Sequence, residues 1–190
     1  MKRPRVGFYS WFVLVFLALA GPPVAATPSS AAEKTDAALL QAIDQGDTDG
    51  AVRLLKQGAS ANTRDAAGRT ALMYAAITGQ TQVVMKALLD RGADVNARSS
   101  DGTTALIAAS TFGDPKAIRM LLSKGAEVNA RDSGGETALT WAKNRLRHAP
   151  TDRSLFPKMP AKNNYGDFTF CTKEEFEQVV ELLEGAGGEE

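Results

Sequence analysis

The chain has very little of the side-chain chemistry that catalytic and metal sites need. It holds one histidine, His148, and one cysteine, Cys171, in 190 residues. The common zinc sites combine several cysteine and histidine ligands, so this sequence cannot build one. A serine or cysteine triad would have to recruit His148, and no nucleophile elbow surrounds any serine. We therefore expect a protein that is not an enzyme, with no catalytic residues, no metal and no cofactor.

Nucleotides and nucleic acids are not indicated as ligands either. The glycines form neither a Walker loop nor a dinucleotide fingerprint. Basic and acidic residues are balanced, with 22 of each, whereas nucleic-acid binding depends on basic groups that neutralise phosphates. A single cysteine also excludes an internal disulfide. Cys171 is expected either to be buried as a small apolar residue or to pair with another chain.

The beginning of the sequence has the regions of a secretory signal peptide in their usual order. Basic residues precede an apolar run over 11–20, and a small-x-small site ends at Ala26. We expect residues 1–26 to be removed on export, so the protein would be periplasmic or secreted. Removal of these residues takes away three basic groups and leaves 22 − 3 = 19 basic against 22 acidic residues. A membrane anchor is the alternative, but the run is shorter than the about 20 apolar residues of a span. The remaining chain is expected to be a monomer without stable membrane insertion, and 27–35 a flexible leader.

Beyond the leader, one pattern returns along the chain. The triplet Thr-Ala-Leu begins at Thr70, Thr104 and Thr137, which are 34 and 33 positions apart (104 − 70 and 137 − 104). A glycine turn precedes each triplet. A second motif, Gly-Ala-x-x-Asn, recurs at a similar spacing and closes the units; it begins at Gly58, Gly92 and Gly125. Coincident motifs at a nearly constant spacing indicate a repeat array.

Inside one unit, the residues predict two packed helices. In the second unit, the small residues Ala71 and Ala75 lie beside Leu72, so a second helix can pack closely against this surface. That second helix carries one apolar stripe. Its members are Val83, Val84, Ala87, Leu88 and Leu89. Gly79 and Gly92 follow the two helices, and glycine ends a helix readily because it adopts a left-handed cap without steric cost.

Together these motifs resemble the ankyrin repeat. The resemblance covers residues 36–190 and implies an all-α solenoid of about four helix-turn-helix units with β-turn loops. The units are expected at about 36–68, 69–102, 103–135 and 136–190. The first unit lacks the threonine and has the polar outer side of an end cap. The usual Thr-Pro-Leu-His of the family reads here as Thr-Ala-Leu followed by Met73, Ile107 or Thr140.

The last unit is interrupted by a long insert over 149–171. Its second helix is expected only at 173–184, where Thr172 and Glu175 form a capping box. The insert contains several prolines, which disfavour a helix, and several aromatics, which are rare in disordered segments. Two interpretations stay open. The insert either folds over the apolar end of the array as a cap, or exposes aromatic anchors to a partner. The anchors would be Phe156, Tyr165 and Phe168.

In proteins that this chain resembles, the turn tips and the exposed side of each first helix form a concave surface that meets partners. Carried over by position, the turn-tip residues expected to bind a partner are Arg69, Asp101, Thr103 and Glu136. On the first helices, the corresponding residues are Tyr74, Thr78, Thr111, Phe112, Trp141 and Arg145. Tyr74 and Trp141 occupy equivalent places in their units, and aromatic residues are frequent both in interfaces and in cores.

The sequence therefore predicts an exported module for protein–protein interaction, whose partner is another protein. One alternative is an inhibitor or immunity protein for an exported hydrolase, in which the insert plugs the active site. A second alternative is an enzyme that uses carboxylates around His148. Loss of activity in His148→Ala, with partner binding intact, would support the enzyme.

Overall fold

Eight helices make up the part of the chain that the structure describes, which is residues 31–78, 81–149 and 172–190 of a computed structural model. They are α2 (Ala31–Asp44), α3 (Thr48–Lys56), α4 (Ala71–Ile77), α5 (Thr81–Asp90), α6 (Ala105–Phe112), α7 (Pro115–Ser123), α8 (Ala138–Leu146) and α9 (Lys173–Gly185). Within these ranges there is no strand, and an isolated bridge joins Arg64 and Thr70. The expected all-α repeat solenoid is confirmed.

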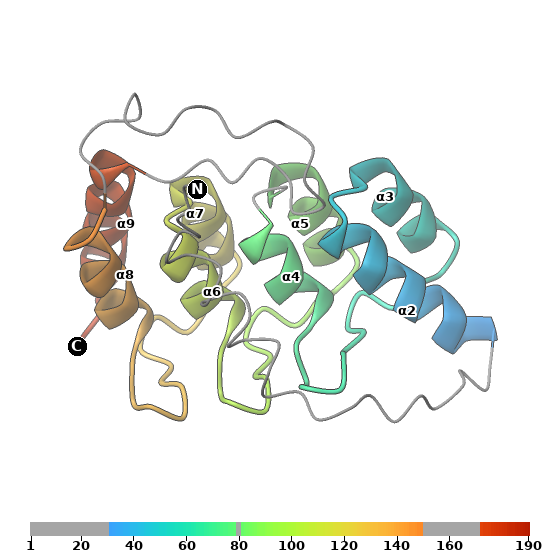
Figure 1. The fold of residues 1–190 in the computed structure, drawn as a ribbon, viewed down its shortest axis with the longest axis horizontal. Helices are drawn as coiled ribbons and strands as arrows, with labels where there is room; N and C mark the ends of the chain where they lie inside the picture. The colour runs from blue at the N-terminus through green and yellow to red at the C-terminus, as the bar shows by residue number, and fades with distance from the viewer. Residues whose placement is uncertain (1–30, 79–80, 150–171) are drawn as a thin grey trace, which may run out of the picture.

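The helices stack in two layers (Figure 1). The inner layer consists of α2, α4, α6 and α8, and each of these helices contacts the next one. The outer layer consists of α3, α5, α7 and α9, which also contact one another in order. The loops that lead into α4, α6 and α8 project from one side of the stack (Figure 1). We call these loops the first, middle and last fingers, and they span residues 64–70, 98–104 and 131–137.

The repeated threonines begin the inner helices. The Oγ1 atoms of Thr70, Thr104 and Thr137 accept hydrogen bonds from the amide of the third residue of each helix, at 3.3, 3.3 and 3.2 Å. Each threonine has the extended backbone angles that suit an N-cap. Replacing such a cap by alanine typically costs about 1 kcal/mol. The Thr-Ala-Leu motif is therefore a helix start that recurs once per unit.

Every described helix places one leucine in the core, with at most 2% of the side chain exposed. These leucines are Leu39, Leu55, Leu72, Leu88, Leu106, Leu121, Leu139 and Leu183. Buried alanines such as Ala75, Ala109 and Ala142 fill the space between them, and their small size lets neighbouring helices approach closely. The core is thus a continuous row of leucines from one end of the stack to the other. Among the described residues, no helix has the length and apolar character needed to cross a membrane.

Helix α9 completes the last unit although it follows α8 only after a long interval in the sequence. It contacts both α7 and α8, which is the position of an outer helix. The capping box at its start is confirmed: the Thr172 amide donates to Glu175 Oε2 (2.8 Å), and Thr172 Oγ1 accepts from the Glu175 amide (3.3 Å). The predicted insert over 149–171 lies outside the described residues except for Ala149.

The first helix begins earlier than the sequence pattern indicated. Helix α2 starts at Ala31, so residues 31–35 are helical and do not belong to the flexible leader expected over 27–35. Ala31 and Ala32 are strong helix formers, and Glu33 places an acidic group in the first turn, where the helix dipole favours it. Residues 27–30 lie outside the described part of the chain.

Candidate protein-binding surface

The three fingers share one tight turn. In the first finger, the Asp65 amide donates to the Arg69 carbonyl (3.0 Å), and the Gly68 amide donates to the Asp65 carbonyl (3.0 Å). The middle and last fingers repeat both bonds between equivalent atoms. Neighbouring fingers are also joined, because Ser100 N donates to Ala67 O (2.9 Å) and Ser133 N donates to Asp101 O (2.8 Å). The fingers therefore form a linked row beside the inner helices.

Three side chains form a compact cluster at the base of the first finger. The Tyr74 hydroxyl donates to Asp65 Oδ2 (2.9 Å), and Arg69 Nε donates to the same oxygen (2.7 Å). The Arg69 guanidinium also lies 5.0 Å from the centre of the Tyr74 ring, within the range of a cation–π contact. Burial raises the pKa of Asp65, but the hydrogen bonds from Arg69 and Tyr74 outweigh it, so this pKa lies below its usual value. Two predicted contact residues, Arg69 and Tyr74, thus touch each other.

The last finger has the same arrangement, except that an acidic residue takes the place of the arginine. Trp141 Nε1 donates to Asp132 Oδ2 (2.8 Å), as Tyr74 donates to Asp65 in the first finger. Glu136 stands at the position of Arg69, and its Oε2 atom is buried without a hydrogen-bond partner among the described residues. Trp141 is half-buried. The two aromatic residues that the sequence placed at equivalent positions are therefore both fixed by an aspartate of their own finger.

The middle finger has no such aromatic residue. Ala108, which is 4% exposed, stands at the equivalent position. Ser99 replaces the aspartate and donates from its Oγ to the Asp101 carboxylate, which also accepts from the Thr103 amide (3.1 Å). The predicted contact residues Asp101 and Thr103 are therefore joined by a hydrogen bond. Asp101 is exposed and Thr103 half-buried.

The remaining predicted residues lie at the far ends of the inner helices. Arg145 Nε donates to the Thr111 carbonyl (3.0 Å) and so joins α8 to the last turn of α6. Thr111, Phe112 and Thr78 are half-buried, whereas Arg145 is exposed. These residues form a second group, separate from the finger clusters. The predicted anchors of the insert, Phe156, Tyr165 and Phe168, lie outside the described residues.

The asparagines of the Gly-Ala-x-x-Asn motif join neighbouring units. Asn62 donates from Nδ2 to the Gly92 carbonyl (3.0 Å) and accepts from the Asp94 amide (2.7 Å). Asn96 makes the same pair of bonds with Gly125 O (3.1 Å) and Glu127 N (2.8 Å). Each asparagine thus binds the backbone of the next unit at two points. Sequence reasoning noticed the Gly-Ala-x-x-Asn motif but missed this role.

Arginines supply a second link between units. Arg64 Nη1 donates to the carbonyls of Gly68 (3.1 Å) and Arg98 (2.9 Å). Arg98 in turn donates to the carbonyl of Arg131. The spacing of these arginines equals that of the threonines, and this periodicity was the signal that could have revealed them. Asp65 and Asp132 were also missed, although each precedes its aromatic partner by 9 positions.

The structure gives no support to chemistry around His148. This histidine is exposed, and its Nδ1 lies 2.9 Å from the Asn144 carbonyl of its own helix end. In the described ranges, no three His, Cys, Asp or Glu side chains are grouped so that they could hold a metal ion. The polar side chains of the fingers are instead engaged in fixing the loops. The fingers therefore present a surface whose shape is fixed by these hydrogen bonds.

Comparison with known protein families identifies the repeats. The family model described as ankyrin repeats, in three copies, matches residues 39–132. These residues are ankyrin repeats. The last unit, with α8 and α9, lies beyond the matched residues and continues the same stack. None of the curated proteins matches the chain.

The ankyrin array is a module for protein–protein interaction, and this fold is typically a scaffold without catalytic activity. The structure places the predicted finger residues and first-helix residues on the fingers and on the inner layer. It brings Arg69 to Tyr74, Asp101 to Thr103 and Arg145 to Thr111. Their role in binding a partner stays a prediction.

The Tyr74 hydroxyl of the ankyrin array should ionise at an unusually high pH. Burial, followed by the hydrogen bond to the Asp65 carboxylate, raises the pKa of Tyr74 to about 12. Because the folded state favours the protonated phenol, this contribution to stability is present below the ordinary pKa of 10.0 and is lost as the pH rises through about 12. Alkaline titration followed by phenolate absorbance should show one late step that Tyr74→Phe removes. In Asp65→Asn, that step should move to lower pH, and an unchanged step would contradict the assigned contact.

Proposed function

We propose that this protein is exported and binds a partner protein with its concave surface. That surface consists of the three fingers and the exposed side of the inner layer. The observation that carries the proposal is the fixation of Tyr74 and Trp141 by aspartates of their own fingers (2.9 and 2.8 Å). Tyrosine, tryptophan and arginine are the residues most enriched among interface hot spots. Side chains that are already held in place lose little conformational entropy when a partner binds.

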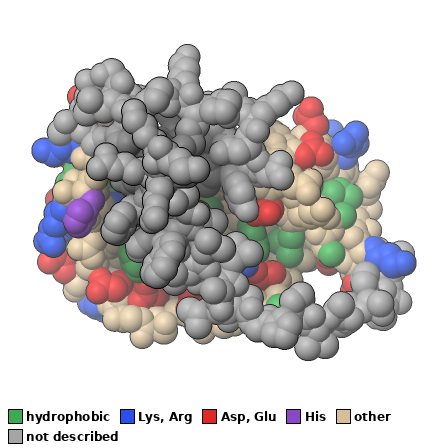
Figure 2. Space-filling model, viewed as in Figure 1, with side chains coloured by type: hydrophobic (Ala, Val, Ile, Leu, Met, Phe, Trp, Pro, Cys, Tyr) green, Lys and Arg blue, Asp and Glu red, His purple; other side chains and the backbone are tan. Residues whose placement is uncertain are grey.

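The charges along the fingers indicate what kind of partner surface would fit. The first finger carries two arginines, Arg64 and Arg69, against one carboxylate, whereas the last carries two carboxylates, Asp132 and Glu136, against one arginine. The middle finger has one charge of each sign. Figure 2 shows acidic side chains along the lower part of this face, on the side of α8. A partner would therefore place an acidic group against the first finger and a basic group against the last. Such complementarity mainly fixes the orientation of a complex and speeds its association.

A pair of arginine variants tests the concave surface. Partners would be captured from an extract of the exported fraction with the array as bait, and the affinity of the recovered protein would then be measured. We expect Arg69→Ala to weaken binding about tenfold or more, on the scale of an interface hot spot. Arg119→Ala, an exposed arginine of the outer helix α7, is the matched control and should change affinity less than about twofold.

Melting of both variants separates binding from folding. Arg69 forms an ion pair with Asp65 (2.7 Å) whose side chains are 36% and 19% exposed, and the loss of such a pair costs about 1 kcal/mol or less. A tenfold loss of affinity with a small change in melting temperature would support the concave surface. Equal partner affinity of the two variants would indicate that the partner binds the outer layer or the insert.

Two further measurements test the parts of the proposal that rest on sequence alone. Intact-mass measurement of the protein from exporting cells should show a species that begins after Ala26. The inhibitor alternative requires the insert to contact the hydrolase. Replacing Phe156, Tyr165 and Phe168 together with alanine tests whether the insert makes this contact. A loss of partner affinity at an unchanged melting temperature would favour the insert as an aromatic anchor. Full partner affinity with a large loss of stability would indicate that the insert is a cap.

A further inference from the structure

Asp65 and Asp132 hold the turn and the aromatic ring of their fingers in the same way. Oδ1 of each aspartate accepts from the amides two and four positions later, at 2.8 to 2.9 Å. Oδ2 of each accepts from the aromatic side chain, which is Tyr74 in the first finger (2.9 Å) and Trp141 in the last (2.8 Å). The two fingers therefore build one frame from a carboxylate and a ring.

The first finger adds a cation to this frame, and the last finger does not. Arg69 Nε donates to Asp65 Oδ2 (2.7 Å), and its guanidinium lies 5.0 Å from the centre of the Tyr74 ring. The equivalent residue of the last finger is Glu136. In the described part of the chain, no second donor reaches Asp132 Oδ2, and Glu136 Oε2 is buried without a hydrogen-bond partner. The last finger thus has the frame, a second carboxylate and no positive group.

We call Asp132, Glu136 and Trp141 the last-finger cluster. Like charges that share a site are unfavourable, and a buried carboxylate oxygen without a donor costs free energy. An indole face attracts a cation more strongly than a phenol ring does. A guanidinium is planar and presents several N–H donors, so it can bond to carboxylates while it stacks on a ring. One guanidinium would therefore satisfy all three side chains of the cluster.

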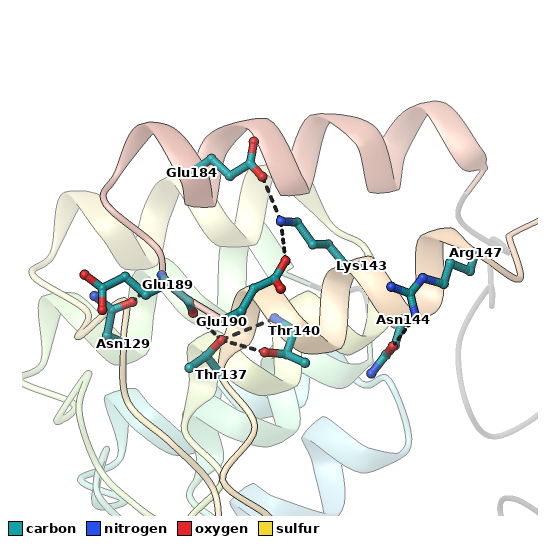
Figure 3. A network of polar contacts seen from close by, with 9 residues as sticks. All are labelled: Asn129, Thr137, Thr140, Lys143, Asn144, Arg147, Glu184, Glu189 and Glu190. Atoms are coloured by element: carbon teal, nitrogen blue, oxygen red, sulfur yellow. Dashed lines mark hydrogen bonds and ion pairs between the residues drawn. The ribbon is translucent and has the colours of Figure 1, made fainter.

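Neighbouring basic residues of the chain are bound elsewhere. Arg131 Nη1 donates to the Gly135 carbonyl (2.7 Å). Lys143 forms ion pairs with Glu184 (3.0 Å) and Glu190 (2.6 Å), as Figure 3 shows. Among the described residues, no cation forms an ion pair with either carboxylate of the last-finger cluster. The missing positive group is therefore one that a partner can supply.

We propose that the last-finger cluster binds an arginine side chain of the partner protein, as Asp65 and Tyr74 bind Arg69 within the chain. The first finger shows that a frame of this kind holds a guanidinium. All three side chains of the cluster are half-buried, so each keeps a side that a ligand can reach. The site belongs to the concave surface and therefore rests on the proposed function, for which it names the side chain that the partner presents to the last finger.

Fluorescence of Trp141 tests the site without the partner. The chain has two tryptophans, and in the full chain carrying Trp11→Phe the ring of the cluster is the one that remains. The probe is the peptide Ala-Ala-Arg-Ala-Ala with blocked ends. We expect a saturable change of fluorescence. The same peptide with citrulline, the neutral isostere of arginine, should bind at least about tenfold more weakly, and the lysine peptide should also bind more weakly because an ammonium lacks the planar fork.

Two pairs of variants in the Trp11→Phe chain make the result specific. Glu136→Gln removes one carboxylate at nearly constant shape and should weaken binding of the arginine peptide about tenfold. Glu127→Gln, at an exposed glutamate outside the cluster, is the matched control and should leave this affinity unchanged. Glu136→Arg places a guanidinium in the cluster from within the chain. It should abolish peptide binding and raise the melting temperature by about 2 to 4 °C relative to Glu127→Arg.

The partner captured from the extract separates this site from the proposed function. A loss of partner affinity of about tenfold or more in both Arg69→Ala and Glu136→Arg would support both. A loss in Arg69→Ala with full affinity in Glu136→Arg would keep the concave surface and overturn the arginine site. If neither variant changes partner affinity, the concave surface is not the contact, and the peptide titration still decides whether the cluster binds arginine.

Three results of the peptide titration would overturn the site itself. The first is a fluorescence of Trp141 that does not change with the arginine peptide. The second is equal binding of the arginine and citrulline peptides, or of the arginine and lysine peptides, which would remove the selectivity for a guanidinium. The third is equal peptide affinity of Glu136→Gln and Glu127→Gln, which would show that the carboxylate of Glu136 takes no part.

Discussion

Replacing Leu88 with alanine is expected to lower the free energy of unfolding by about 2 to 5 kcal/mol, the range for fully buried leucines. The Leu88 side chain is 0% exposed. It lies in α5, which contacts α3, α4 and α7, so the cavity would weaken one unit and its interfaces with both neighbours. Stability in a repeat array depends on these interfaces as well as on each unit. Urea denaturation followed by circular dichroism measures the change.

Val83→Ala is the control on the same helix. Val83 belongs to the apolar stripe that the sequence predicted, but its side chain is 59% exposed. Its replacement should change the free energy of unfolding by less than about 0.5 kcal/mol. Equal effects of the two substitutions would show that α5 is rotated relative to the core described above.

Gly102→Ala is expected to destabilise the protein by about 2 to 5 kcal/mol. Gly102 has a φ of 77°, and a left-handed conformation costs a residue with a Cβ about 1 to 2 kcal/mol. The new Cβ would also lie 3.1 Å from the Asp132 Cα of the next finger. Because backbone cannot rotate away as a side chain can, this overpacking adds about 1 to 3 kcal/mol.

Gly135→Ala separates the two causes. Gly135 is the equivalent glycine of the last finger, with a φ of 82°, but no atom lies within 4 Å of the Cβ that would be added. This variant should therefore lose only the about 1 to 2 kcal/mol of the left-handed conformation. Thermal unfolding of both proteins measures the difference. A loss in Gly102→Ala no larger than in Gly135→Ala would mean that the fingers are not in contact.

Much of the fold could be predicted because the signals are local and repeated. The threonine caps, the capping box at Thr172 and the glycine ends of helices depend on residues within a few positions of one another. The early start of α2 was missed because Ala31 and Ala32 carry no motif of the repeat. Helix propensity alone extends the helix over them, and the repeat pattern does not register it.

The candidate site was predictable in position but not in contacts. Matching units by number identified Arg69, Tyr74 and Trp141. It did not show that Asp65 and Asp132 hold the two aromatic rings, because a bond across 9 residues depends on how the finger turns back onto the helix. The reversal of charge between Arg69 and Glu136 was visible in the sequence. Only the structure showed that the first is paired with Asp65 while Glu136 Oε2 lacks a partner among the described residues.

The sequence by itself determined the starts of α4, α6, α8 and α9, because these starts follow from periodicity and from bonds within one helical turn. The tertiary structure alone decided how the units are joined. Asn62 meets Gly92 across 30 positions, and Asn129 meets Gly187 across 58. Such partners are fixed only when the helices have packed and brought distant backbone groups within hydrogen-bond distance.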